Sequence, residues 1–273
     1  MRTFDSFFKL RPSALSLRGQ SMKKTALLAA AAALFAASPA MAQSGGHVGV
    51  NYGNTDSGTS DADTWQIDGA LGGTSGSLGY QFDAGVGSSD TGSSDVDDYT
   101  LAGHLYWAGE NWRLGGVVAM SNLDGGSVSV DETVYGVEGS VNFGPSTVVL
   151  GSYTVGESEL GIDADTWNAD IGLNHYFTDN FRLGVTAGTG NIDIGIGDTD
   201  TTSLGVSAEW QPWTTPVSFR LSYDTFDIDS NANSLDTLAF GVRWNWGGSL
   251  RERDNATPFE IRTGIYQRVY GIQ

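Results

Sequence analysis

The chain has 273 residues, with 14 basic and 32 acidic side chains and a formal net charge of −18. This charge argues against nucleic acid or an anionic surface as a binding partner. The chain contains no cysteine, which excludes disulfides, thiol catalysis and thiolate metal sites.

The first 42 residues predict export. Met22–Ala42 holds two lysines, an apolar run, a Ser-Pro break and a small-x-small end, which is the pattern of a secretory signal peptide cleaved before Gln43. The apolar run stops well short of the roughly 20 residues that a membrane-spanning helix needs. We therefore expect residues 1–42 to be an N-terminal extension followed by a signal peptide. The remainder has eight basic residues, all arginines, against 31 acidic ones.

After this leader the sequence alternates between apolar and polar residues, and it shows no helical period. Residues 99–107, for example, place Leu101 and Trp107 on one face and His104 on the other. Most such segments have ten to twelve residues, close to what a tilted strand needs to cross a bilayer. Twelve strands are predicted, near residues 47–54, 64–73, 76–87, 98–108, 111–121, 133–143, 146–155, 166–177, 180–190, 202–211, 216–226 and 236–246. The strand near 146–155 fits both phases, so we assign none of its residues to a face.

The connections between these segments alternate in length. Short ones such as "AGEN" and "FGPS" are followed by long ones such as "GSSDTGSSDVDD". The six long connections hold 20 acidic residues and no basic residue. A meander of hairpins with tight turns on one side and long loops on the other is typical of outer-membrane barrels.

The position of the aromatic residues indicates which face meets lipid. A secreted soluble β-protein would show the same alternation with its apolar face turned inward. Aromatics on the apolar face cluster at the strand ends, however, as two interfacial girdles would, and the polar face carries many small residues that suit a lumen. These end-placed aromatics are Trp107, Trp112, Phe143, Phe177, Phe181, Trp210, Phe219 and Trp246 beside short turns, and Trp65, Tyr99, Tyr135 and Trp167 beside long loops.

With this signal peptide, these twelve strands, the acidic long loops and the girdles, the sequence resembles the porin-like β-barrel proteins of Gram-negative outer membranes. The resemblance covers residues 43–246 and rests on architecture rather than on a sequence motif. It implies an all-β fold, an antiparallel up-and-down transmembrane β-barrel of about 12 strands in the cell outer membrane. Residues 247–273 depart from the pattern, because such barrels usually end at the last strand. We interpret them as a periplasmic C-terminal tail or a possible extra strand.

Period two also predicts which charged side chains face the lumen. Three arginines lie just after short turns, and each stands in the sequence between two residues of the apolar face, the first of them aromatic. A fourth arginine lies on the last strand at a similar depth. The inward arginines are Arg113, Arg182, Arg220 and Arg243. The alternative is that they anchor at the interface. Lipid-facing arginine is costly except near the membrane surface, which favours the lumen.

The same parity turns six acidic side chains inward. Two of them are expected to form cross-strand pairs with inward arginines. The pairs are Glu209 with Arg220 and Asp170 with Arg182, which flank short turns. They either brace the wall or form opposing rows of charge in a pore, and the sequence favours neither. The inward acids are Asp68, Asp83, Glu138, Asp170, Glu209 and Asp224.

Two function classes remain open. We expect a pore for passive diffusion of small hydrophilic solutes, cation-preferring because its outer mouth is acidic. The alternative is a non-conducting barrel with a structural, adhesive or surface-interaction role. No enzymatic motif and no cofactor or metal site is predicted. Expected partners are outer-membrane lipid, lipopolysaccharide bridged by divalent cations, and small solutes or ions.

Overall fold

The computed structural model describes residues 44–92, 95–126, 129–159, 163–195, 197–212, 215–228 and 234–259. The chain divides into two compact units, residues 1–40 and 41–273, and all described residues belong to the second. The expected signal peptide and N-terminal extension lie outside the described residues.

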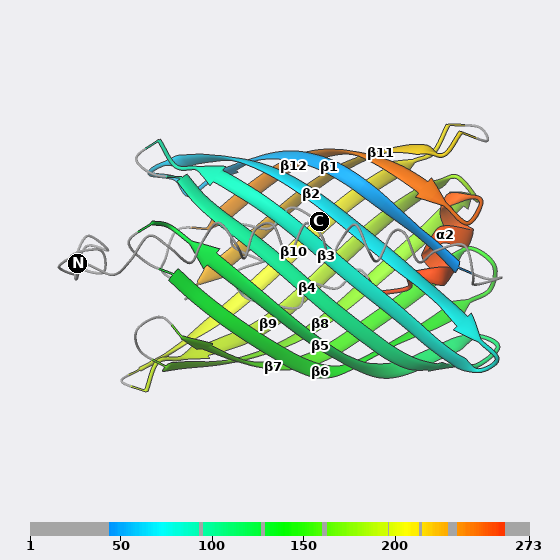
Figure 1. The fold of residues 1–273 in the computed structure, drawn as a ribbon, viewed down its shortest axis with the longest axis horizontal. Helices are drawn as coiled ribbons and strands as arrows, with labels where there is room; N and C mark the ends of the chain where they lie inside the picture. Colours follow the sequence, from blue (N-terminus) through cyan, green and yellow to red (C-terminus); the bar gives the residue numbers. More distant parts are fainter. Residues whose placement is uncertain are drawn as a thin grey trace, which may run out of the picture. The chain divides into compact units, whose positions relative to one another are not determined.

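The second unit is a closed antiparallel barrel (Figure 1). Each strand pairs with its neighbours in sequence, and β1 pairs with β12, with Gly46 opposite Trp246, to close the ladder. This confirms the predicted up-and-down barrel of twelve strands. The strands in the described residues are β1 Ser44–Asp56, β2 Asp61–Ser75, β3 Leu78–Asp90, β4 Asp95–Ala108, β5 Trp112–Asp124, β6 Ser129–Phe143, β7 Thr147–Glu159, β8 Asp163–Thr178, β9 Phe181–Asp193, β10 Asp198–Trp210, β11 Val217–Ile228 and β12 Leu235–Trp246.

The apolar face of the barrel points outward. Leu204 and Ile171 are more than half exposed, and so are girdle residues such as Trp107 at the short-turn end and Trp65 at the long-loop end. Burying such a surface against other protein would be expected in a soluble fold, whereas lipid covers it in a membrane barrel. The predicted orientation of the alternation, with apolar residues outward, is therefore confirmed.

The strand that the sequence left unassigned has a definite phase. In β7, Leu150 and Thr154 are buried inside the barrel, and Tyr153 is about half exposed on the outer face. Both faces carry apolar residues because Val148 points inward as well, where it lines a cavity together with Pro258. The double apolar pattern thus reflects contact with another part of the chain inside the lumen.

Four of the long hairpins close with the same local turn. In each, an aspartate carboxylate accepts a hydrogen bond from the backbone N–H of a glycine two residues later, at 2.6–2.9 Å. The glycines have positive φ angles of 74–77°, which a side chain would strain. The pairs are Asp56 with Gly58, Asp90 with Gly92, Asp124 with Gly126, and Asp193 with Gly195.

Most acidic residues of the long loops surround the outside of the barrel rim. They share the outward parity of Trp65, and their register sets like charges directly opposite, as with Asp63 and Asp90 or Asp97 and Asp124. Every strand contributes to this carboxylate collar. It comprises Asp56, Asp61, Asp63, Asp90, Asp95, Asp97, Asp124, Asp131, Glu157, Glu159, Asp165, Asp193, Asp198, Asp200, Asp227 and Asp236. The sequence predicts this charge at the outer mouth; in the structure these side chains point away from the lumen.

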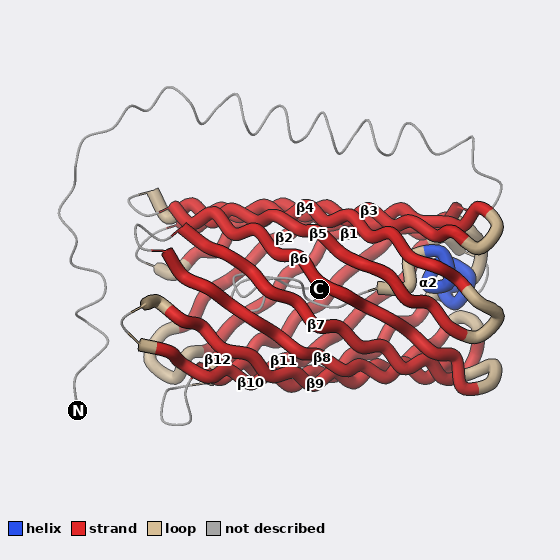
Figure 2. The backbone as a smooth tube through the Cα atoms, turned by 90° about the horizontal axis from the view of Figure 1, so that it is seen from below, coloured by secondary structure: helices blue, strands red, loops and turns tan. Residues whose placement is uncertain are grey.

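The start of the C-terminal tail differs from both expectations for it. Gly247 and Gly248, with φ angles of 98° and 112°, turn the chain after β12, and helix α2 (Leu250–Ala256) follows. Figure 2 shows α2 within the barrel, at its short-turn end. Residues 249–259 are thus neither a periplasmic extension nor a strand, because their buried charges face partners on the inner wall. The proposed extra strand falls in residues 260–273, outside the described residues.

Adjacent residues of β9 test which face meets lipid. Val185 points outward and Thr186 into the lumen, near the middle of the strand. Val185→Arg should lower the free energy of unfolding by about 2–4 kcal/mol, because an arginine at the bilayer midplane loses its hydration. Thr186→Arg should change it by less than about 1 kcal/mol. Urea unfolding in lipid vesicles measures both, and equal losses would contradict the orientation.

Candidate functional site

The candidate site is the lumen at the short-turn end, where charged residues of the wall meet α2. Three of the four predicted arginines, Arg182, Arg220 and Arg243, are buried inside the barrel. Arg113 is partly buried and also faces the lumen, in a cavity shared with Asn255. The arginines therefore do not anchor at the lipid interface. Their role as pore-lining residues stays a prediction.

Glu209 lies at the centre of this arrangement. The strand register places it between Arg182 of β9 and Arg220 of β11. Its carboxylate accepts hydrogen bonds from Arg253 of α2 at 2.6 and 3.0 Å, and from Arg182 at 3.1 Å. Arg243 and Arg220 lie 3.4 and 3.9 Å away. The Glu209 side chain is fully buried, so these guanidinium groups replace the water that would otherwise solvate its charge.

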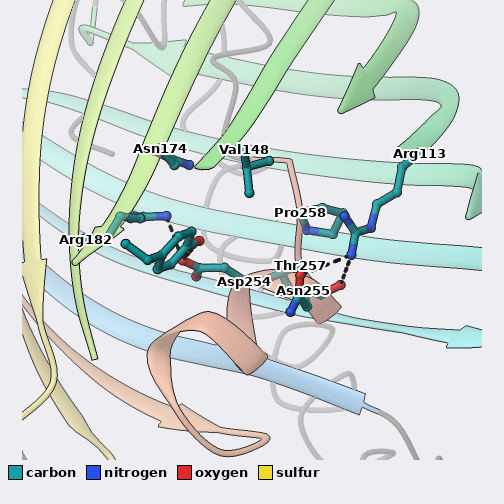
Figure 3. Close-up of a pocket in the computed structure, with 9 residues that line it drawn as sticks. Arg113, Val148, Asn174, Arg182, Asp254, Asn255, Thr257 and Pro258 are labelled. Carbon is teal, nitrogen blue, oxygen red and sulfur yellow. Dashed lines mark hydrogen bonds and ion pairs between the residues drawn. The ribbon is translucent and has the colours of Figure 1, made fainter. Parts of the chain in front are cut away.

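Asp254 joins α2 to a second strand pair. Its Oδ2 accepts hydrogen bonds from Arg182 at 2.8 Å and from the Tyr176 hydroxyl at 2.7 Å. Its Oδ1 accepts from Arg253 at 2.6 and 2.8 Å. Figure 3 shows Arg182 reaching Asp254 from the wall. Arg253 thus pairs with the wall carboxylate of Glu209, and Asp254 pairs with the wall guanidinium of Arg182.

Asp68 continues the network onto β1 and β2. It accepts one hydrogen bond from Asn51 at 2.7 Å and lies 2.8 Å from the ring nitrogen Nε2 of His47. Arg243 donates to the same carboxylate at 3.4 Å, and so connects Asp68 with Glu209. One continuous chain of charges therefore runs along the inner wall from β2 through β12 to β9.

A separate cluster occupies the facing wall. His104 has both ring nitrogens 2.7 Å from a carboxylate oxygen, Nε2 from Asp83 and Nδ1 from Glu138. Both contacts are satisfied when the imidazole carries two N–H groups, since each carboxylate then accepts a hydrogen bond. The histidine is 5% exposed and Glu138 is 3% exposed.

The chain after α2 contacts this second cluster. The Phe259 ring stacks on His104 with centroids 5.8 Å apart, and it meets Tyr106 edge-on at 5.2 Å. Gln81 holds the same residue by its backbone, because its amide nitrogen donates to the Phe259 carbonyl and its amide oxygen accepts from the Phe259 N–H, at 2.8 and 3.1 Å. Residues 253–259 therefore connect the two charged clusters across the lumen.

The space beside this segment is uneven: a cavity of about 670 Å³ borders Glu252, Asn255 and Ala256, whereas little space remains on the side of Arg182. Arg113 donates to the backbone and side-chain oxygens of Asn255, both at 3.3 Å. Between that contact and Arg182 lies a cavity of about 10 Å³, bordered also by Thr257 and Pro258 (Figure 3). Such a volume holds about one water molecule. The gap between the segment and this part of the wall is too small for a solute.

The start of α2 is fixed by a capping box. Ser249 accepts a hydrogen bond from the Glu252 backbone, and the Glu252 carboxylate accepts hydrogen bonds from the Ser249 N–H and hydroxyl at 2.8 and 3.0 Å. The bond from the backbone N–H, followed by that from the hydroxyl, lowers the pKa of Glu252 below its ordinary value. The cap is therefore ionised and intact at neutral pH, and it sets the direction in which α2 leaves the two glycines.

One of the two predicted cross-strand pairs forms and the other is wrong. Glu209 and Arg220 are direct neighbours in the β10–β11 register. In the β8–β9 register, however, Tyr176 lies opposite Arg182, and Asp170 lies opposite Gly188, six positions further along the strand. Asp170 is further from the turn than Arg182, so it lies nearer to the long-loop end of the lumen. Asp224, opposite Gly205, also faces the lumen.

Sequence reasoning missed two kinds of lumen residue. Asp98 was counted with the preceding acidic loop although it begins the predicted strand, and Glu132 was missed because β6 extends further than the alternation suggested. The contacts of Arg253 and Phe259 were missed because the tail has no alternation. The available signal was the Ser-x-x-Glu pattern beginning at Ser249, which marks a helix start.

A family model described as the autotransporter beta-domain matches residues 148–250, which is less than half of the chain. No curated protein matches the sequence significantly.

Solved structures similar to this one are outer-membrane barrels. An outer-membrane channel from Pseudomonas putida F1 is 13% identical with a TM-score of 0.56, over 74% of this chain and 95% of that one. The translocator domain of the autotransporter NalP from Neisseria meningitidis is 16% identical, with a TM-score of 0.50 over 83% and 95%. The KdgM porin, in complex with disordered oligogalacturonate, is 9% identical, with a TM-score of 0.50 over 73% and 99%. The chain therefore has the fold of a porin-like outer-membrane β-barrel.

The central position of Glu209 can be tested by neutralising it. Glu209→Gln should lower the free energy of unfolding by about 3–5 kcal/mol, because several buried guanidinium groups lose their shared counter-charge. Glu159→Gln removes the same charge from the exposed carboxylate collar and should change it by less than about 0.5 kcal/mol. Unfolding in detergent, followed by tryptophan fluorescence, provides the comparison. A loss for Glu209→Gln no larger than for Glu159→Gln would contradict the role assigned to it.

Proposed function

We propose that this protein is an outer-membrane pore for small hydrophilic solutes, which residues 249–259 close at the periplasmic end. The girdles and the outward apolar face support a place in the membrane, and the carboxylate collar supports an outer-leaflet position for the long-loop end. Export by a cleaved signal peptide belongs to this proposal. Lipopolysaccharide, held through divalent cations, stays a predicted partner of the collar. We propose no catalytic role.

One observation carries the closed state: Arg253 of α2, fully buried, binds Glu209 of β10 on the inner wall through two hydrogen bonds. Such a charge-assisted pair is stronger than a neutral hydrogen bond, and it positions α2 across the lumen. The barrel ladder closes through β1 and β12 without any contribution from the tail. The segment can therefore leave the lumen without breaking a strand pair.

The lumen charges support cation preference once the segment has left. Among described strand residues, the inward face carries four arginines and eight carboxylates, so its formal charge is negative. An excess of one sign in a pore attracts the opposite ions. The arginines are the four predicted from the sequence, and the carboxylates are Asp68, Asp83, Asp98, Glu132, Glu138, Asp170, Glu209 and Asp224.

The alternative is a barrel that never conducts and serves a structural or surface role. The buried ion pairs of Arg253 and Asp254, with the water-sized gap beside them, favour it if the segment stays in place permanently. The two functions differ in a single property, which is whether weakening the segment's contacts produces ion flow.

Two arginines of α2 make this comparison possible at constant charge. Arg253→Gln in the full chain should raise the open fraction of single channels at least about ten-fold, because it removes charge-assisted hydrogen bonds made only in the closed state. Arg251 is partly exposed and lies 3.6 Å from the exposed Asp179, so Arg251→Gln should change little. Planar-bilayer recordings measure both variants.

If the Arg253→Gln protein folds and inserts but passes no more current than the Arg251→Gln protein, the pore is contradicted. The non-conducting barrel is then the better account.

Selectivity can be measured in the Arg253→Gln background from the reversal potential in a salt gradient. We expect cation preference. Asp98→Asn with Asp224→Asn should reduce it, because both side chains face the lumen. Asp63→Asn with Asp90→Asn, which removes the same charge from the carboxylate collar, should have a smaller effect because water and salt screen those charges. Anion preference before any of these changes, or a larger effect of the collar pair, would contradict the lumen-charge argument.

A further inference from the structure

We propose that the inner wall is a peptide-binding site, and that residues 253–259 are its built-in occupant. The ligands it fits are peptides with an adjacent guanidinium and carboxylate, followed five residues later by an aromatic ring. This inference deepens the proposed function, because an external peptide reaches the site through the lumen. Three subsites carry it.

The first subsite takes a guanidinium group. Glu209 accepts two hydrogen bonds from Arg253, and the side-chain oxygen of Asn245 accepts a third at 2.8 Å. Glu209, Asn245 and the bound Arg253 are almost completely buried. A planar cation with several fixed donors fits this arrangement, whereas an ammonium group would fill only part of it.

The second subsite takes a carboxylate on the neighbouring residue. Arg182 and the Tyr176 hydroxyl both donate to one oxygen of Asp254, at 2.8 and 2.7 Å. Arg182 also donates to Glu209, so a single guanidinium joins the two subsites. The wall offers a carboxylate to the ligand's guanidinium and a guanidinium to the carboxylate of the next residue. It therefore binds these two charges in that order along the peptide.

The third subsite reads a peptide unit and a ring together. Gln81 binds both the N–H and the carbonyl of Phe259, as an adjacent strand would. His104 and Tyr106 hold the ring on two sides. Peptide-binding sites recognise the backbone and the side chain of the same residue, whereas a solvated pore wall contacts water and solutes.

The wall residues also contact one another, independently of the segment. Glu209 contacts Arg182 and Arg243, and Gln81 makes two hydrogen bonds to Asp83 at 2.9 and 3.0 Å. His104 contacts both carboxylates. Side chains that are already held in place lose little freedom on binding, so the emptied site is preorganised for another peptide.

The connection of the segment to the barrel explains why the site is occupied. Gly247 and Gly248 lie directly between β12 and the capping residue Ser249. A short flexible link gives the tethered segment an effective concentration in the millimolar range. An external peptide therefore competes poorly with the intact segment, and it binds well once the contacts of that segment are weakened.

The test uses the full chain and a synthetic peptide with the sequence of residues 249–259, acetylated, amidated and fluorescently labelled. The receptor is the full-length Arg253→Gln, Phe259→Ala double variant, whose own segment is weakened at two subsites. We expect the peptide to bind this variant at least ten-fold more tightly than it binds the unaltered protein, as fluorescence anisotropy in detergent micelles would show.

Two altered peptides provide the matched control. A peptide with Arg253→Gln should bind at least ten-fold more weakly, because it loses the charge-assisted hydrogen bonds to Glu209. A peptide with Arg251→Gln, with the same change of charge two positions away, loses only a guanidinium 5.9 Å from the centroid of the Tyr176 ring and should bind within about three-fold of the original. If these two peptides bind with equal affinity, or if the original peptide does not bind the double variant, the proposed site is contradicted. If that variant does not fold, as judged by heat-modifiable electrophoresis, full-length Asp254→Asn with Phe259→Ala replaces it.

Binding and conduction are separate readouts. The proposed pore fails if weakening the segment gives no current, and anisotropy still reports peptide binding in that case. The peptide site fails if the peptides do not discriminate as stated, even when the Arg253→Gln channel conducts.

Discussion

The structure depends on one constraint: inside lipid, every backbone N–H and C=O must find its partner within the chain. The pairing of β1 with β12 satisfies this by leaving no sheet edge in the barrel. Closure with strict alternation then directs each second side chain inward. Charged residues at those positions cannot reach lipid, and they must satisfy one another or bind water in the lumen.

That requirement produces the network around Glu209. Burying an unpaired carboxylate is costly, and a fully buried one is tolerated here because guanidinium groups approach it from three wall strands and from α2. The same contacts that solvate the charge hold the segment after β12 across the lumen. Stability of the wall and the position of the segment in the lumen therefore rest on shared side chains, and Arg253 is the member that belongs to the segment after β12.

Alternation predicted the twelve strands and the inward direction of Arg182, Arg220 and Arg243, because period two is a local property of each strand. It could not predict which charges meet, since that depends on register: Asp170 lies eight residues before the end of β8, whereas Arg182 is the second residue of β9. It also stopped short at the acidic ends of the strands, where polar residues on both faces hide the period. The tail was invisible to it, because α2 is set by its cap and by distant partners rather than by its own pattern.

The central claim is that the segment after β12 lies inside the barrel against the wall. Gly45 and Ala256 test it directly in a chain that has no cysteine, because a Cβ atom at Gly45 would lie 2.8 Å from that of Ala256. A Gly45→Cys, Ala256→Cys protein in membranes should form an intramolecular disulfide almost completely on mild oxidation, since small shifts bring this pair into disulfide range. Two free thiols that both react with maleimide, and no cross-link, would contradict the account.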